Sequence, residues 1–321
     1  MNNYDFDWSG LAFGSKKPIS SLRATFIAAP RQISTARLTQ LIKEYLPIGN
    51  IILGIAKEDY IDGFLDQPQF KTLKQSDVQT IIDKVNSSAS PHKITILRYF
   101  QRELVPIVEK IKPVRAVFIN GSWHFSFHTL PIYYALTNLH IPHSLISPFT
   151  DEAEAKAYEQ KIIKAIKQPE QKVFSSGEQV MSLVDTVAKS SFDYGWQTGL
   201  VLAKKTKAGY EYITSAINRV VPYQTYAMHH GASRELNFSP PNDLNHYDTI
   251  HAEMELIVKA QKENIDLKGT TLFINLIPCP TCARSLCTTD IEEYVYANDH
   301  SNGYAAELFQ KCGKKVKRTI Q

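Results

Sequence analysis

The sequence predicts an α/β protein of two domains, a parallel-sheet domain over residues 1–170 and a second α/β domain over residues 171–321. Strand-like and helix-like segments alternate through the first half, which is typical of a parallel sheet with helices on both faces. Turn-forming and polar residues at 168–171 and 175–177 indicate a boundary. The length of 321 residues also exceeds the usual size of one domain.

The first domain is expected to contain five buried strands. Each is a short run rich in apolar residues, the pattern of a strand covered on both faces. The runs are Ala24–Ala29, Asn50–Ala56, Lys93–Leu97, Arg115–Ile119 and His143–Ile146. A parallel sheet of such strands is Rossmann-like, and it binds ligands at the carboxyl ends of its strands.

Helical spacing of apolar residues separates these strands. The expected helices cover Thr35–Leu46, Asp77–Val85, Gln101–Ile111, Pro131–Leu139 and, as a charged helix, Thr150–Lys167. Ser34 and Ser76 stand where N-caps are expected, because a serine hydroxyl accepts a hydrogen bond from a free N–H group of the first helical turn.

A polar and aromatic run, Asn120–His128, follows the fourth predicted strand, where a ligand crevice would open. It could hold a nucleotide or a sugar phosphate, and the alternative is a turn with a buried tryptophan and surface histidines. Ala29–Gln32 with Ser34–Thr35 forms a weaker patch of the same kind. Gly10–Lys17 lacks the spacing of a Walker loop, and no Gly-x-Gly-x-x-Gly follows a predicted strand, which argues against a kinase-like domain.

The second domain carries two short motifs, His251-Ala252-Glu253 and Pro278-Cys279-Pro280-Thr281-Cys282. One imidazole and two thiolates can hold a zinc ion that keeps its fourth position for water, and zinc lowers the pKa of bound water to about 7. Glu253 adds a free carboxylate that can carry protons. These four groups are the signature of a zinc-dependent nucleobase deaminase.

The expected local structure brings the two motifs together. Ala252–Lys262 reads as a helix, and Thr270–Leu276 reads as a strand that delivers the cysteines at its carboxyl end. Cys279 and Cys282 lie three residues apart, and Pro280 suits the first position of a helix, so both sulfurs lie on one face of its first turn. An isolated Cys-x-x-Cys could also be a redox pair or half of a structural zinc site.

From about Gly199 to Arg318 the chain resembles the deoxycytidylate deaminases of the zinc-dependent cytidine and deoxycytidylate deaminase superfamily. The residues that carry the resemblance are Leu267–Phe273, Pro278–Arg284, Ile291–Tyr296, Ala305–Phe309 and Cys312–Val316. The resemblance implies a cytidine-deaminase-like α/β/α domain, Zn²⁺ as cofactor, a small-molecule nucleotide substrate and a homo-oligomer. The roles that it implies are zinc ligation by His251, Cys279 and Cys282, catalysis by Glu253, and substrate binding by Asn218 and the backbone of Ala252 and Pro278.

The chain departs from the family pattern near the expected sugar and phosphate sites. Arg219 replaces the glycine that follows the family's asparagine, a pairing also seen in tRNA adenosine deaminases, and Glu255 replaces a neutral amide. A long insert between Arg219 and Ile250 is expected to be a loop, either over the active-site mouth or solvated on the surface. Within it, Arg234 or a histidine could meet a 5′-phosphate.

Composition narrows the partners and the compartment. The net charge is +4, and no basic stripe interleaved with aromatic residues is present except the short tail Lys314–Arg318, which is more typical of a solvated final strand, so nucleic acid is disfavoured as a partner. The amino terminus is polar and acidic, and no apolar run of membrane length occurs, so no membrane partner is expected. Four cysteines, two of them assigned to zinc, favour the cytoplasm.

Three functions are consistent with these residues. The leading prediction is hydrolytic deamination of a cytosine nucleotide, dCMP to dUMP with release of ammonia, with a nucleotide effector bound by the first domain. The second is a deaminase that acts on bases in RNA or single-stranded DNA, as tRNA adenosine deaminases do. The third is a non-catalytic zinc-binding module, which would have no use for Glu253.

Overall fold

The computed structural model describes residues 23–166, 171–240 and 247–319, which form two compact units. The N-terminal unit extends to Ile162 and also contains Thr225–Tyr247, and the C-terminal unit contains Ile163–Gln224 and the chain from Asp248 onward. The domain boundary predicted at 170/171 stays a prediction, since residues 168–170 of the expected linker lie outside the described residues, as does Gly10–Lys17.

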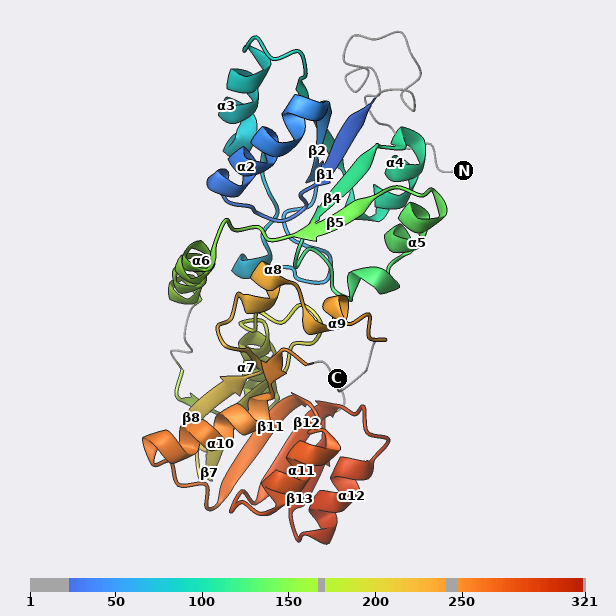
Figure 1. Ribbon diagram of the computed structural model, residues 1–321. Coiled ribbons are helices and arrows are strands. Elements are labelled where there is room, and N and C mark those ends of the chain that lie inside the picture. The colour runs from blue at the N-terminus through green and yellow to red at the C-terminus, as the bar shows by residue number, and fades with distance from the viewer. Residues whose placement is uncertain (1–22, 167–170, 241–246, 320–321) are drawn as a thin grey trace. The chain divides into compact units, whose positions relative to one another are not determined.

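The N-terminal unit is built on a parallel five-stranded sheet, as predicted (Figure 1). Its strands are β1 Ala24–Ala28, β2 Asn50–Ala56, β3 Ile94–Tyr99, β4 Arg115–Ile119 and β5 His143–Ile146. They lie in the order β3-β2-β1-β4-β5, and all neighbouring pairs are parallel. This order reverses direction between β1 and β4, so the sheet has the topological switch point of a Rossmann-like fold.

Helices cover both faces of this sheet (Figure 1). Helices α2 Thr35–Tyr45 and α3 Gln75–Asn86 pack on one face, and α4 Leu104–Ile111 and α5 Pro131–Asn138 pack on the other. Helix α6, Glu152–Ala165, follows β5. Short 3₁₀ turns complete the unit, namely η2 Leu46–Ile48, η3 Pro68–Phe70, η4 Gln101–Glu103 and η5 Phe127–Thr129.

One of the two predicted N-caps is confirmed and the other is wrong. The Ser34 side chain caps α2 by accepting a hydrogen bond from the backbone N–H of Arg37 at 2.9 Å. Helix α3 begins one residue before Ser76, and Lys74 is its N-cap. The backbone N–H of Lys74 donates to Asp77 Oδ2 at 3.2 Å, so the third helical residue, rather than a serine at the cap, stabilises this end.

The insert predicted as a loop forms two short helices, α8 Tyr226–His230 and α9 Ser233–Leu236, and it clusters with the N-terminal unit. Thr225 Oγ1 donates to Ala155 O at 3.0 Å. The imidazole Nε2 of His128 lies 2.9 Å from Ser239 O. Tertiary contacts of this kind cannot be read from local sequence pattern, and they explain why an apparent loop folds here.

The contact between His229 and Ser147 predicts that protonation of His229 lowers the free energy of unfolding. Ser147 Oγ lies 2.7 Å from His229 Nδ1 and accepts the N–H of Phe149, so its own hydrogen is available for the neutral imidazole. Burial disfavours the charged ring and lowers the pKa of His229, and His230 and Arg37 lower it further. Below the ordinary histidine pKa of about 6.5 the unfolded chain therefore binds a proton more readily than the folded one.

We expect the His229 contribution to the free energy of unfolding to fall as the pH drops from about 7.5 to 5.5, so that over this interval wild type loses more stability, or gains less, than His229→Gln. Urea denaturation at the two pH values measures the effect. His300→Gln is the control, because His300 is an exposed histidine that does not contribute to the pKa shift of His229. An equal pH dependence in wild type and His229→Gln would contradict this assignment.

The C-terminal unit is a three-layer α/β/α structure around a six-stranded mixed sheet (Figure 1). Its strands are β6 Val173–Phe174, β7 Gly199–Thr206, β8 Gly209–Ile217, β11 Thr270–Leu276, β12 Glu293–Asn298 and β13 Lys315–Arg318, in the order β13-β12-β11-β7-β8-β6. Helix α7, Gly177–Ala188, covers one face. The other face packs against α10 Ala252–Glu263, α11 Pro280–Cys287 and α12 Tyr304–Lys311.

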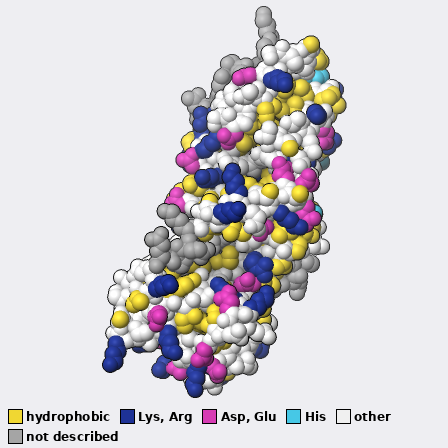
Figure 2. All heavy atoms as spheres, turned by 90° about the vertical axis from the view of Figure 1, so that its left-hand side faces the viewer, with side chains coloured by type: hydrophobic (Ala, Val, Ile, Leu, Met, Phe, Trp, Pro, Cys, Tyr) yellow, Lys and Arg dark blue, Asp and Glu magenta, His cyan; other side chains and the backbone are white. Residues whose placement is uncertain are grey.

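Charged side chains of both signs are distributed over the surface, in agreement with the modest net charge of +4. Figure 2 shows lysine and arginine side chains interspersed with aspartate and glutamate on the face that it presents. Among the described residues, we find no helix that combines the length and the apolar character needed to cross a membrane.

Candidate metal centre and active site

The predicted zinc ligands come from the amino ends of two helices that pack on the same face of the sheet. Strand β10, Thr249–Ile250, pairs antiparallel with β9, Arg219–Val220, and leads directly into His251. His251 is the N-cap residue of α10, and its extended backbone turns the chain from the strand into the helix. The strand pair therefore fixes where the imidazole stands.

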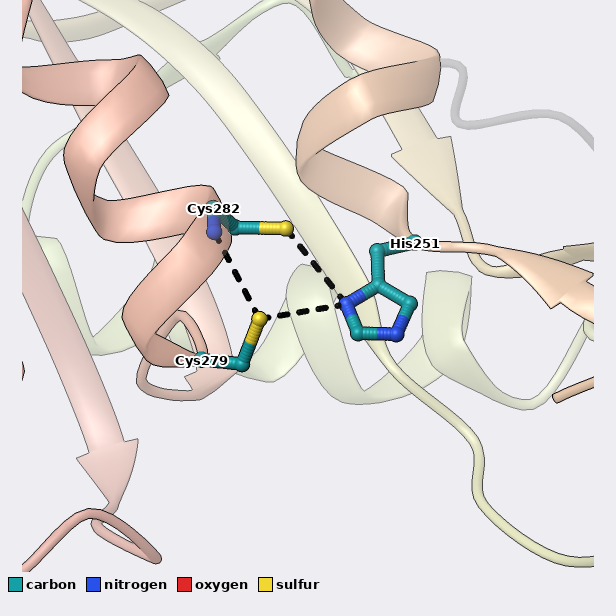
Figure 3. A group of neighbouring side chains, drawn as sticks. All are labelled: His251, Cys279 and Cys282. Carbon is teal, nitrogen blue, oxygen red and sulfur yellow. Dashed lines mark hydrogen bonds between the residues drawn. The ribbon is translucent and has the colours of Figure 1, made fainter. Parts of the chain in front are cut away.

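The two cysteines lie at the start of α11, which follows β11 as predicted. Cys279 is the N-cap of this helix, Pro280 is its first residue, and Cys282 lies in its first turn. The Cys279 Sγ accepts the backbone N–H of Cys282 at 3.4 Å. His251 Nδ1 lies 3.7 Å from Cys279 Sγ and 3.4 Å from Cys282 Sγ (Figure 3). The structure thus brings the three predicted ligands together.

This group fits a zinc ion by its donor chemistry. One nitrogen and two sulfur atoms lie within 4.8 Å of one another, and they are the donor types that zinc prefers. Three protein ligands are the number found at catalytic zinc sites, where a fourth position stays open. Among the described residues, it is the one group of histidine, cysteine and acidic side chains with this spacing.

The electrostatics of the pair of cysteines favour one thiolate even before a metal binds. The hydrogen bond from Cys282, together with the nearby His251 imidazole, lowers the pKa of Cys279 well below the usual thiol range. The same contact, in which Cys282 faces the Cys279 thiolate, raises the pKa of Cys282. A metal ion must therefore displace the Cys282 proton when it binds both sulfurs.

Glu253 lies in the first turn of α10 and is 3% exposed. Burial raises the pKa of its carboxyl to about 7, although the helix backbone and the His251 charge oppose the shift. Its carboxyl also interacts with the Cys282 side chain, which places it beside the ligand group. A carboxyl that titrates near neutrality can both accept and release a proton.

Asn218 directly follows β8, and all its side-chain hydrogens are in use. Its Nδ2 donates to Asp193 Oδ2 at 2.9 Å and to Trp196 O at 2.7 Å. Its Oδ1 accepts the N–H of Thr198 at 2.8 Å. Asn218 therefore fastens the loop of residues 191–198. The contact with Cys279 raises the pKa of His251, and Asp193 in this loop adds to the rise. No motif in the sequence pointed to this loop.

The two unusual residues near the site, Arg219 and Glu255, form an ion pair. Arg219 Nη2 lies 3.2 Å from Glu255 Oε2, and the two side chains are 39% and 23% exposed. The pair joins β9 to the first turn of α10. Each residue alone is a departure from the family pattern, but their charges are opposite and compensate each other. The spacing of the two residues in the sequence does not reveal this pairing.

The two residues expected to offer their backbone to a substrate flank the ligands. Ala252 is fully buried at the first position of α10, directly after His251. Pro278 is buried between β11 and α11, directly before Cys279. Their role in substrate binding stays a prediction, since being next to a metal ligand in sequence does not by itself define a contact with the substrate.

Residues 175–298 match the family model of the cytidine and deoxycytidylate deaminase zinc-binding region. The chain is 34% identical over 71 residues to the ComE operon protein 2 of Bacillus subtilis (strain 168), a match that covers 22% of this chain and 38% of that protein. It is 33% identical over 51 residues to the deoxycytidylate deaminase of Enterobacteria phage T4, covering 16% of this chain and 26% of that protein. The matches therefore span well under two thirds of these relatives.

A solved structure of the dCMP deaminase from the cyanophage S-TIM5 in complex with dCMP and dUMP aligns with a TM-score of 0.36 and 20% identity. The alignment covers 44% of this chain and 95% of that chain. The match to the family model includes His251, Glu253, Cys279 and Cys282. Residues 175–298, which contain the ligand group, are therefore similar to the zinc-binding region of the cytidine and deoxycytidylate deaminases.

Proposed function

We propose that this protein is a zinc-dependent hydrolase that deaminates a cytosine nucleotide, converting dCMP to dUMP with release of ammonia. The observation that carries the proposal is the buried Glu253 carboxyl beside a group of one imidazole and two cysteines. The match of residues 175–298 to the deaminase family supports it. The name of the phage T4 relative, a deoxycytidylate deaminase, favours dCMP as the substrate.

His251, Cys279 and Cys282 would hold the metal. When bound, zinc lowers the pKa of water toward 7 and so supplies a nucleophile at neutral pH. Glu253 takes the proton from the attacking water while the water oxygen forms a bond to C4 of cytosine, and it delivers that proton to N3. Glu253 then carries the second proton from the oxygen to the amino group. The C4–N bond breaks, and dUMP and ammonia leave.

Burial of the Glu253 carboxyl supports its role in these proton transfers. Because Glu253 is buried, its carboxyl exchanges protons with the reacting groups rather than with bulk water. A purely structural zinc site would take a fourth protein ligand. It would also have no use for a buried carboxyl whose pKa lies near 7. This argues against the non-catalytic alternative. The alternative of a nucleic-acid deaminase rests on Arg219, whose guanidinium is paired with Glu255.

A substrate panel tests the proposal. Purified zinc-loaded protein is assayed for ammonia release from cytidine, deoxycytidine, their mono- and triphosphates, adenosine nucleotides, and short single-stranded DNA and RNA. We expect the highest kcat/KM with dCMP. Activity on a polymer alone would replace dCMP by a flipped or single-stranded base as the substrate.

We further propose that Asn218 serves the substrate site. Both of its N–H donors are used by the loop at 191–198, so a sugar hydroxyl would use the second lone pair of Oδ1. Asn218→Ala is expected to raise KM for dCMP about tenfold or more, because it removes this acceptor and releases the loop.

The variant Asn275→Ala separates the effect of losing the Asn218 acceptor from the effect of releasing the loop. Asn275 Oδ1 accepts the N–H of Gly199 and its Nδ2 donates to Gln197 O, so it holds the end of the same loop. Steady-state kinetics of both variants give KM and kcat. A larger rise in KM for Asn218→Ala than for Asn275→Ala supports direct contact, and equal rises would leave Asn218 only a positioning residue.

A further inference from the structure

The four cysteines of the chain form two pairs, and one of these pairs lies outside the metal centre. Cys279 and Cys282 stand at the start of α11, whereas Cys287 is the last residue of the same helix. Cys312 is the C-cap of α12, which packs beside α11 (Figure 1). Both Cys287 and Cys312 are free thiols, the first half-buried and the second exposed. The proposed deamination makes no use of this second pair.

A single carbonyl oxygen brings Cys287 and Cys312 together. The Cys287 Sγ donates a hydrogen bond to Leu308 O at 3.9 Å, and the backbone N–H of Cys312 donates to the same oxygen at 3.0 Å. The Cys287 thiol also interacts with the Cys312 side chain. Burial raises the pKa of the Tyr294 phenol and both thiols add to the rise, so both lie near the same ring. Neighbouring thiols on two packed elements are the starting arrangement for a disulfide.

The two thiols differ in exposure and in charge state. Burial raises the pKa of Cys287 to about 11, the contact with Cys312 adds to the rise, and Lys314 opposes it. Lys314 Nζ donates to Thr289 O at 2.5 Å, so it ties the chain after α12 to the chain after α11. A thiolate is the attacking form in disulfide exchange, and access decides which thiol reacts. The exposed Cys312 therefore meets an oxidant first, and Cys287 reacts second.

We propose that Cys287 and Cys312 form a reversible disulfide under oxidising conditions, which ties the carboxyl end of α11 to that of α12. The oxidant is the disulfide of a small thiol, such as oxidised glutathione. The Cys312 thiolate attacks one sulfur of the oxidant and releases one small thiol. The Cys287 thiolate then attacks Cys312 Sγ and releases the second. Each cysteine proton passes to a departing thiolate, so the pair is oxidised by two electrons and the small disulfide is reduced to two thiols.

This bond restrains the helix that carries two of the expected zinc ligands. Helix α11 has Cys279 and Cys282 at its amino end and Cys287 at its carboxyl end. A disulfide that closes the loop 287–312 reduces the freedom of the unfolded chain and so stabilises the folded one. In a reducing compartment the pair stays as two thiols, and the restraint appears only when an oxidant is present. The inference does not rest on the proposed deamination.

Peptide mapping of the full-length, zinc-loaded protein after incubation with oxidised glutathione tests the bond directly. Trypsin cuts after lysine and arginine, so Cys287, Cys312 and the two cysteines of the metal centre fall on separate peptides, namely 285–311, 312–314 and 269–284. We expect 285–311 and 312–314 to be joined, lighter by two hydrogens than their sum, and separated by a reducing agent. The chain should stay monomeric in non-reducing denaturing electrophoresis and keep its zinc.

Three results of this mapping would overturn the proposal. The first is recovery of 285–311 and 312–314 without any link between them. The second is a link that involves 269–284 together with loss of zinc, which would make the metal ligands the oxidised pair. The third is a disulfide between two chains, seen as a dimer in the non-reducing gel.

The melting temperature gives a second readout. Oxidation should raise it in wild type by at least about 4 °C, because a disulfide that closes a loop of this length stabilises a domain by several times the thermal energy. Cys287→Ser and Cys312→Ser should show no rise, and each variant in its reduced state is its own reference for folding. A rise as large in either serine variant, or a linked wild type that melts no higher than the reduced protein, would contradict the proposed restraint.

Discussion

Glu253→Gln is expected to lower kcat for dCMP deamination by about 10²–10⁴-fold while the protein keeps its zinc and its fold. Glutamine has the shape of glutamate but cannot take a proton from water or return one to the base. Because the carboxyl is buried and its pKa is raised by that burial, replacing it by a neutral amide should not lower the melting temperature.

Three measurements on the same preparation check this expectation. Metal content by mass spectrometry and the melting temperature should match wild type, and only turnover should fall. Glu255→Gln is the matched control, since Glu255 lies two residues further along the same helix and is paired with Arg219. A Glu253→Gln variant as active as wild type would contradict the proton-transfer role.

Loss of a zinc ligand is expected to remove both the metal and the activity. Cys279→Ser, Cys282→Ser and His251→Ala each leave two ligands, and three are needed to hold the ion while a fourth position stays open. Because metal binding adds to folding stability, each variant should also melt at least about 4 °C lower, roughly the effect of 1 kcal/mol in a domain of this size.

Cys287 and Cys312 provide the matched controls, because neither belongs to the ligand group. Cys287→Ser and Cys312→Ser should retain one zinc per chain and full turnover. Zinc retained by Cys279→Ser and Cys282→Ser, or lost equally from the control variants, would show that the metal lies elsewhere.

Much of the fold follows from local pattern. The strands at 50–56, 115–119, 143–146 and 270–276 have the predicted limits, because each is an apolar run bounded by turn-forming or polar residues. The ligand group is predictable for the same reason. Its cysteines are close in sequence, and a strand and a helix of ordinary length carry them to the histidine.

The parts that sequence did not predict depend on contacts between distant residues. The part of the insert at 225–240 folds because it packs within the N-terminal unit, through contacts such as Ser147 with His229. The Arg219–Glu255 pair spans a strand and a helix, and the Asn218 amide is committed to a loop that precedes it by some twenty residues. Spacing along the chain gives no signal for any of these contacts.

The most direct test of the proposed function is to follow dCMP with purified protein of known zinc content, quantifying dUMP and ammonia together. Equal amounts of the two products from zinc-loaded protein, and neither from chelator-treated protein, are the predicted result. Full zinc occupancy with no product from dCMP would contradict the proposed reaction.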